Sequence, residues 1–258
     1  MRRRRSFCLI IYSGLLWVQA GQGTEFDHSH PLFATVLQKH VRNGLVDYSG
    51  LKTNPNDLQS YLNEMGEVKE EAFKKWSQPQ QLAFLINLYN ASVLKLIIDH
   101  YPVKSIKKIG GFFGQPWDVD VVPYFGQIAT LGYLEHEVIQ KNYREPRVHF
   151  ALVCASRGCP DLRSEPYQPQ ILQEQLNDQA RRFLNDPAKN RVDTRERRVY
   201  LSAIFKWYAE DFEHQSGSVL KFIEPYLPPD SQKALKQGGY KIRYTDYDWS
   251  LNDAGVRR

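Results

Sequence analysis

The segment from Gln78 to His100 constrains the fold more than any other part of the chain, because apolar residues recur at helical spacing along its whole length. These are Leu82, Phe84, Leu85, Leu88, Ala91, Leu94, Ile97 and Ile98, and Tyr101-Pro102 ends the pattern. The spacing predicts a mostly buried helix. It carries Asn87 and Asn90 on one face, and because polar amides among apolar side chains need partners, the pair marks either a structural hydrogen-bond network or a functional site.

Shorter periodic segments lie on both sides of this helix. The spacing of apolar residues predicts helices over residues 31–41, 58–68, 169–185 and 202–212, and another that starts at Thr130 or Gly132. Strands are predicted over 117–124, 147–153 and 241–244, with a hairpin-like stretch over 191–200. Helices therefore dominate, and the fold class is α+β: a single mainly helical domain with a small sheet, without a regular alternation of strands and helices.

The first residues have the pattern of an export signal. Residues 2–5 are arginines, residues 7–16 are mostly apolar, and Val18 and Ala20 precede a glycine-rich stretch. The apolar run is shorter than the roughly 18 to 20 residues of a membrane span, so we predict a signal peptide over residues 1–20 rather than an uncleaved anchor. The order from Arg4 to Leu9 also resembles a twin-arginine signal. Residues 21–258 are then a single globular domain, periplasmic or secreted, with no later run apolar and long enough to cross a bilayer.

The charge of this domain gives it no general attraction to polyanions. The chain has a formal net charge of +5, and the four arginines of residues 2–5 account for four of these charges, which leaves +1. We therefore predict no nucleic-acid partner. Asp27, His28 and His30 form only a weak metal-binding pattern, and no HExxH, phosphate-binding glycine loop or GxSxG motif is present. The prediction is no metal and no cofactor.

Two cysteines remain after residue 20, and they flank a short loop. Residues 147–153 read as a buried strand that leads into Cys154, and a thiol at a strand end can face a cleft, where a nucleophile must lie. Its base would be a histidine. Side chains alternate along a strand, so His149 would face away from Cys154, whereas His136 could reach it. The predicted catalytic residues are Cys154, His136, Asn87 and Glu137, with Asn87 or Glu137 orienting the base.

The same cysteines have two other interpretations. Cys154 and Cys159 are close enough in sequence to form a disulfide in an oxidising compartment, if their α-carbons lie within about 7 Å, and a bonded Cys154 could not attack a substrate. The pair could also cycle between thiol and disulfide, although the spacing is longer than in thioredoxin-like motifs.

Four motifs in this order resemble the domain of unknown function family 547. They are Phe84 to Ala91, Leu131 to Ile139, Arg147 to Pro160, and Leu201 to Trp207 with Asp211-Phe212. The resemblance covers about residues 46–212, leaves a Tyr- and Pro-rich C-terminal extension over 213–258, and implies an exported bacterial member of a family without an established activity. The motif positions that it singles out are Asn87, Asn90, His136, His149, Cys154 and Cys159. Arg157 stands where the resemblance implies a smaller or uncharged residue, so it is expected to alter access to Cys154.

These patterns predict a cysteine-dependent hydrolase or acyl transferase that acts on a peptide or amide-like substrate, so the expected partner is a small molecule or a peptide. Backbone amides of Ala155 or Ser156 would stabilise an oxyanion. The residues predicted to bind the substrate are Asn90, His149, Ser156 and Arg157. The alternatives are a non-catalytic binding or interaction domain shaped by a Cys154–Cys159 disulfide, and a thiol-redox protein.

Overall fold

The structure is a computed structural model that describes residues 26–111 and 114–255. Within these residues a mainly helical chain carries three small sheets, so the predicted α+β fold class is confirmed. The signal peptide predicted over residues 1–20 lies outside the described residues.

Helix α5 (Gln78–His100) lies at the centre of the larger of two hydrophobic cores, and its bounds are those predicted. The Ser77 amide donates to Gln80 Oε1 at 2.9 Å, which caps the first turn. By length and composition α5 could span a membrane, so the expectation that no run after residue 20 is long and apolar enough was wrong. In the structure 89% of its most apolar window is buried inside the protein.

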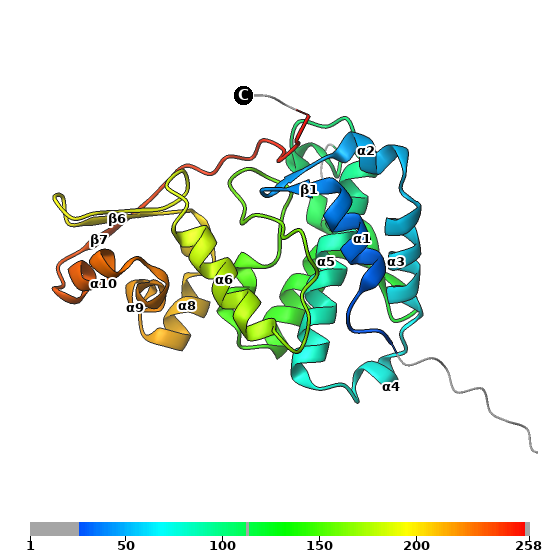
Figure 1. Cartoon of the computed structure of the whole chain (residues 1–258), viewed down its shortest axis with the longest axis horizontal. Helices are drawn as coiled ribbons and strands as arrows, with labels where there is room; N and C mark the ends of the chain where they lie inside the picture. Colours follow the sequence, from blue (N-terminus) through cyan, green and yellow to red (C-terminus); the bar gives the residue numbers. More distant parts are fainter. Residues whose placement is uncertain (1–25, 112–113, 256–258) are drawn as a thin grey trace, which may run out of the picture.

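The elements around α5 complete the first core (Figure 1). Two antiparallel hairpins, β1–β2 and β3–β4, lie among them. The elements are α1 (Pro31–His40), β1 (Val41–Arg42), β2 (Leu45–Val46), α2 (Tyr48–Thr53), α3 (Asn56–Glu67), α4 (Glu70–Phe73), β3 (Asp120–Tyr124), β4 (Gln127–Thr130) and the π-helix η3 (Tyr133–Gln140). The short 3₁₀-helices in this part of the chain are η1 (Ile106–Lys108), η2 (Pro116–Asp118) and η4 (Pro146–Phe150).

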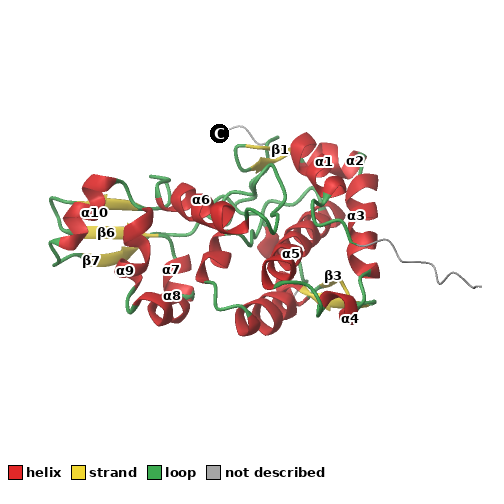
Figure 2. Ribbon diagram, turned by 60° about the horizontal axis from the view of Figure 1, so that its bottom comes forward, coloured by secondary structure: helices red, strands yellow, loops and turns green. Residues whose placement is uncertain are grey.

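A second core is built largely from phenylalanines, and Figure 2 shows its elements at the end of the molecule opposite α1 to α3. Strand β6 (Arg198–Leu201) pairs antiparallel with β5 (Arg191–Asp193) and parallel with β7 (Lys241–Tyr244). The helices of this part are α7 (Ile204–Trp207), α8 (Ala209–Ser216), α9 (Val219–Ile223), η5 (Glu224–Tyr226) and α10 (Pro229–Lys236). Helix α6 (Leu172–Leu184) joins the two cores, because Leu176 is buried in the first and Phe183 in the second.

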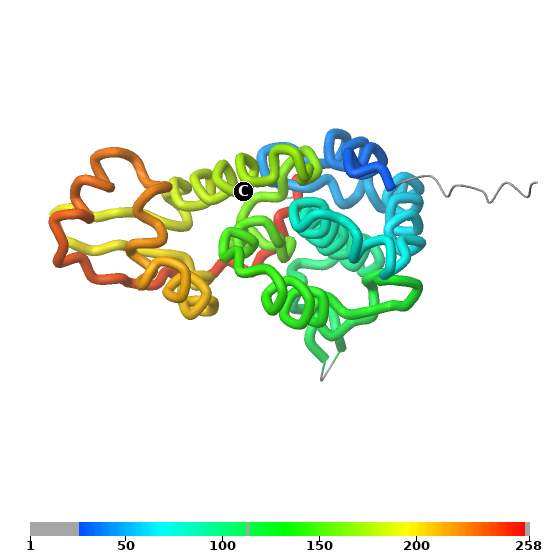
Figure 3. The backbone as a smooth tube through the Cα atoms, turned by 90° about the horizontal axis from the view of Figure 1, so that it is seen from below, coloured from blue at the N-terminus to red at the C-terminus, as the bar shows by residue number. Residues whose placement is uncertain are grey.

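After β7 the chain returns to the first core, as the red segment in Figures 1 and 3 shows. We call residues 245–254 the C-terminal strap. The Val46 amide donates to the Asn252 carbonyl and the Ala254 amide to the Val46 carbonyl, both at 2.9 Å. The buried Tyr48 hydroxyl donates to Asn252 Oδ1 at 2.7 Å. The strap is therefore part of the folded unit, although the sequence placed it in an extension beyond the family-like region.

Candidate functional site

The segment that leads to Cys154 is helical. Pro146–Phe150 forms the 3₁₀-helix η4, with Pro146 in its first turn, where a residue without an N–H leaves no donor unsatisfied. The predicted strand over residues 147–153 is therefore wrong, and the alternation that turned His149 away from Cys154 does not apply. A short apolar run fits a strand and a buried helical turn equally well, so periodicity could not distinguish them.

Of the two asparagines of α5, Asn90 holds the residues just before Cys154 and Asn87 holds Tyr167. Asn90 Nδ2 donates to the Ala151 carbonyl and its Oδ1 accepts from the Val153 amide, both at 3.0 Å. Asn87 binds the amide and the carbonyl of Tyr167 in the same way, at 2.9 and 2.8 Å. Both side chains are buried, and both ends of each are occupied by backbone. The catalytic role predicted for Asn87 and the substrate-binding role predicted for Asn90 are therefore corrected to structural ones.

Cys154 lies among hydrogen-bond donors that favour its thiolate. Its Sγ is 3.1 Å from Ser156 Oγ and 3.2 Å from the Tyr247 hydroxyl, and these two oxygens are 3.2 Å apart. Hydrogen bonds from the Cys159 thiol, the Ser156 side chain and amide, and Tyr247 outweigh the effect of burial and lower the pKa of Cys154 to about 7. Ser156, predicted to bind substrate, thus acts on the sulfur.

Cys159 is the buried partner of Cys154. Its Sγ accepts the Cys154 amide at 2.9 Å, and burial together with the neighbouring Cys154 raises its pKa. Both cysteines are free thiols in the structure. The Cys154–Cys159 disulfide stays a prediction that depends on oxidation.

The C-terminal strap runs directly against the cysteine loop. The Arg157 amide donates to the Ser250 carbonyl and the Gly158 amide to the Asp248 carbonyl, both at 2.8 Å. These bonds bring Tyr247 to the sulfur. Arg157 Nη2 donates to the Asp253 carbonyl at 3.3 Å, so Arg157 holds the strap, and it is not among the residues that line the pocket at Cys154.

Two backbone positions in the loop depend on this packing. A β-carbon on Gly158 would lie 2.9 Å from the Asp248 nitrogen, closer than real β-carbons approach backbone, so only glycine lets the strap lie here. Ala155, next to Cys154, has a φ of 57°, a left-handed conformation that costs a non-glycine residue roughly 1–2 kcal/mol. The Asn252 amide donates to the Ala155 carbonyl at 3.0 Å and helps to hold this conformation.

A pocket of about 240 Å³ opens at Cys154, where the two cores meet. Its walls come from α5, η3, α7 and the strap, which are far apart in sequence. Six of its thirteen lining residues are tyrosines or tryptophans: Tyr89, Trp117, Trp207, Tyr208, Tyr247 and Trp249. Clefts between packed units are common places for small-molecule sites, and this one contains the reactive thiol.

His149 also lines this pocket, and it is paired with a carboxylate. Its Nε2 donates to Asp211 Oδ2 at 2.7 Å, and its ring stacks on Tyr208 with centroids 3.8 Å apart. The hydrogen bond with His149 is the main cause that lowers the pKa of Asp211. Because Nε2 is engaged, Nδ1 is the ring nitrogen left for a group in the pocket.

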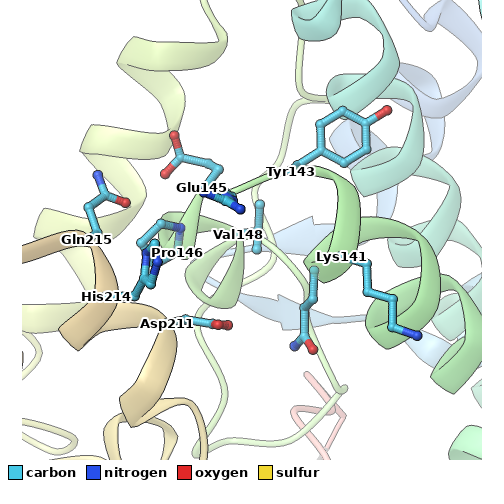
Figure 4. Close-up of a pocket in the computed structure, with 10 residues that line it drawn as sticks. Lys141, Tyr143, Glu145, Pro146, Val148, Asp211, His214 and Gln215 are labelled. Atoms are coloured by element: carbon cyan, nitrogen blue, oxygen red, sulfur yellow. The ribbon is translucent and has the colours of Figure 1, made fainter.

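Asp211 reaches His149 from the other side. Its side chain is 46% exposed in a second hollow of about 220 Å³, which Asp211 and His214 of α8 and Pro146 and Val148 of η4 line (Figure 4). The His149–Asp211 pair therefore separates two hollows, and solvent can reach the carboxylate without passing Cys154.

His136 and Glu137 lie at the surface of η3. His136 contributes to the pocket wall, but it is exposed and its Nδ1 is 3.0 Å from Gln140 Oε1. Glu137 is exposed and pairs with Lys141, so the orienting role predicted for it is corrected. The buried residues of this segment, Leu131, Leu134, Glu135, Val138 and Ile139, recur at ordinary helical spacing, so one carboxylate of the segment lies on its inward face.

That inward carboxylate is Glu135, which is not among the site residues predicted from the sequence. It is 5% exposed. Its Oε2 accepts from the Tyr89 hydroxyl at 2.8 Å and its Oε1 from the Tyr208 hydroxyl at 2.6 Å. Trp117 Nε1 in turn donates to the Tyr89 hydroxyl at 3.1 Å. The sequence signal that could have found it is its helical spacing from Leu131, Val138 and Ile139.

The two histidines of the weak metal-binding pattern, His28 and His30, contact aromatic side chains in the structure. His30 is buried with its Nδ1 2.8 Å from the Tyr61 hydroxyl, and His28 packs edge-on against Trp76. Among residues 26–111 and 114–255, no group of three or more His, Cys, Asp or Glu side chains is arranged to hold a metal ion.

Comparison with known proteins finds a family match for part of the chain. Residues 73–184 match the family described as protein of unknown function, DUF547. No curated protein and no solved structure matches the chain. The matched region contains Glu135, His149 and Cys154, whereas Asp211 and Tyr247 come from beyond it. The match covers less than half of the chain, and it supports the resemblance that the motifs indicated.

Proposed function

We propose that the protein is a cysteine-dependent hydrolase or acyl transferase for small peptide or amide-like substrates, with Cys154 as its nucleophile. The observation that carries the proposal is that Cys154 lies partly exposed in a pocket wall and that the pKa of its thiol is lowered to about 7. At neutral pH about half of such a thiol is thiolate, the form that attacks a carbonyl. An ordinary buried cysteine would be inert.

The His149–Asp211 pair supports a base in a different place from the one the sequence suggested. A base needs a partner that fixes its orientation, and Asp211 holds His149 at 2.7 Å, whereas the exposed His136 contacts only a glutamine through Nδ1. In the proposed reaction the Cys154 thiol gives its proton to His149, and Sγ bonds to the carbonyl carbon. His149 then gives this proton to the amine as the C–N bond breaks, which leaves a thioester on Cys154. Water, or an acceptor amine, then attacks the thioester, loses its proton to His149 and releases Cys154.

The Ser156 amide is suited to stabilise the oxyanion. It already donates to Cys154 Sγ, so it lies beside the position at which the carbonyl oxygen becomes negative. The amides of Arg157, Gly158 and Cys159 are used by Ser250, Asp248 and Ser156, respectively. As charge moves from sulfur to oxygen, the Ser156 amide can follow it without rearrangement of the loop.

Acylation with an activated ester tests the proposal. The full chain is treated with p-nitrophenyl acetate, nitrophenol release is followed, and the acyl group is located by peptide mass spectrometry. We expect acetyl on Cys154, none on that peptide in Cys154→Ala, and turnover slower by roughly 100-fold or more in His149→Ala. His136→Ala is the matched control and should stay near wild type. Absence of acetyl from Cys154 would sink the proposal, and a loss of turnover in His136→Ala alone would return the base to His136.

One observation favours a second candidate, a thiol–disulfide exchange protein. An accessible thiol of low pKa next to a buried thiol of raised pKa is the arrangement of an attacking and a resolving cysteine. In the oxidising compartment predicted from residues 1–20, the two thiols would cycle by exchange with a partner disulfide. Cys159→Ala separates the candidates, because it abolishes exchange with oxidised glutathione beyond the mixed-disulfide stage but leaves acetylation of Cys154 in place.

A further inference from the structure

We infer that the pocket binds a cationic group of its substrate, an ammonium or guanidinium, against the Glu135 carboxylate. The inference rests on the proposed function for the bond that reacts at Cys154, but the binding of the cation itself needs no reaction. Its observation is a buried acidic side chain in the pocket wall, Glu135, that forms no ion pair among the described residues.

Glu135 is buried without an ion pair. It is 5% exposed, and none of the ion pairs among the described residues includes it. A carboxylate taken out of water is costly unless it gains a partner. Tyr89 and Tyr208 give it one hydrogen bond on each oxygen, and each carboxylate oxygen can accept a second. Because Glu135 lines the pocket, these remaining acceptor positions are open to a ligand.

The two tyrosines cannot neutralise this charge. Burial, and then the neighbouring Glu135, raise the pKa of Tyr89 and of Tyr208, so both hydroxyls stay protonated and donate. The other titratable groups of the pocket are Tyr247, whose pKa is raised by burial, His136, His149 and the two cysteines. His149 is already paired with Asp211, and the Cys154 thiolate adds a second negative charge. The field in the pocket therefore favours a cation and disfavours an anion.

The aromatic walls fit the same ligand. Trp207 stacks near Trp249 with centroids 5.7 Å apart, and Tyr247 lies 4.6 Å from Trp249. Faces of aromatic rings attract cations, and the Trp249 ring already has Lys107 Nζ 5.0 Å from its centroid. An apolar ligand would contact the aromatic walls but would leave Glu135 without a positively charged partner.

The size of the pocket limits the class of substrate. About 240 Å³ is less than the roughly 300–1,000 Å³ of sites for drug-sized ligands, so it suits one side chain or a short amine. With Cys154 in the same wall, the substrate class is an amide or ester whose lysine-like or arginine-like group lies near the carbonyl that is attacked.

Charged thiol reagents test this directly. The 2-aminoethyl, methyl and 2-sulfonatoethyl methanethiosulfonates are cationic, neutral and anionic, and each rate of loss of the Cys154 thiol is divided by the rate with 2-mercaptoethanol. Mixed and intramolecular disulfides at Cys154 both count as reaction. We expect the cationic reagent to be favoured over the anionic one by roughly tenfold or more. Glu135→Gln should abolish this preference, whereas Glu137→Gln, the exposed neighbour on η3, should keep it.

A second measurement is independent of Cys154 chemistry and of any variant. Calorimetric titration of the wild-type protein with agmatine should show binding, and 1,4-butanediol should not. Equal normalised rates for the three reagents, or no agmatine binding, would overturn the inference. If the neutral reagent labels Cys154 rapidly and the three reagents show no charge preference, the inferred cation site is wrong but Cys154 can still be the nucleophile. If Cys154 is unreactive but agmatine binds, the cation site is supported and the proposed nucleophile is wrong.

Discussion

Tyr247→Phe removes one donor from the Cys154 sulfur and should raise the pKa of that thiol. The ordinary value is 9.0 and the value in the site is about 7, a difference of two pH units, achieved although burial acts in the opposite direction. Four groups donate: the Cys159 thiol, the Ser156 hydroxyl and amide, and Tyr247. An equal share is half a pH unit, and since the donors also offset burial, we expect an increase of about half to one unit.

The assay is the rate of iodoacetamide alkylation at Cys154 as a function of pH, read by peptide mass spectrometry. At pH 7 the thiolate fraction falls from about one half to roughly one quarter or one tenth, so Tyr247→Phe should react about two- to fivefold more slowly. At pH 9.5 the two proteins should react within about twofold of each other. Tyr244→Phe, which loses an exposed hydroxyl from the end of β7, is the matched control. Identical midpoints for Tyr247→Phe and wild type would refute the assignment of the strap to the thiol site.

Two further predictions concern the strap and a buried histidine. Gly158→Ala should displace the strap, because its β-carbon would lie 2.9 Å from the Asp248 nitrogen; we expect about 1–3 kcal/mol less stability in urea unfolding and a higher alkylation midpoint at Cys154. A wild-type midpoint in a destabilised Gly158→Ala would contradict this. Burial lowers the pKa of His30 to about 3 from 6.5, so the folded state resists a proton that the unfolded state accepts. The free energy of unfolding is therefore unaffected by His30 above pH 6.5 and decreases as the pH falls from 6.5 toward 3. The decrease is about 2 kcal/mol by pH 5. His30→Asn, which suits the φ of 52°, should flatten the loss between pH 7 and 5, and an equally steep loss in that variant would count against the assignment.

The sequence predicted the features that local pattern controls. The bounds of α5 follow from its apolar spacing and from Tyr101-Pro102, and the amides of Asn87 and Asn90 had to find partners because of their place in a buried helix. The motifs also indicated the resemblance to DUF547, whose family model matches residues 73–184. Where the local pattern fitted two structures, prediction failed, as in the apolar run before Cys154 that forms η4 instead of a strand.

The tertiary structure alone decided which groups act on Cys154. Tyr247 is 93 residues from the sulfur that it contacts, and Asp211 is 62 residues from His149. Glu135 meets the hydroxyls of Tyr89 and Tyr208, which are 46 and 73 residues away in the chain. The spacing of apolar residues indicates which face of a helix is buried, because residues one turn apart lie on the same face. It carries no information about which distant donor meets a given acceptor, and that pairing is set only when the strap and α8 pack between the two cores.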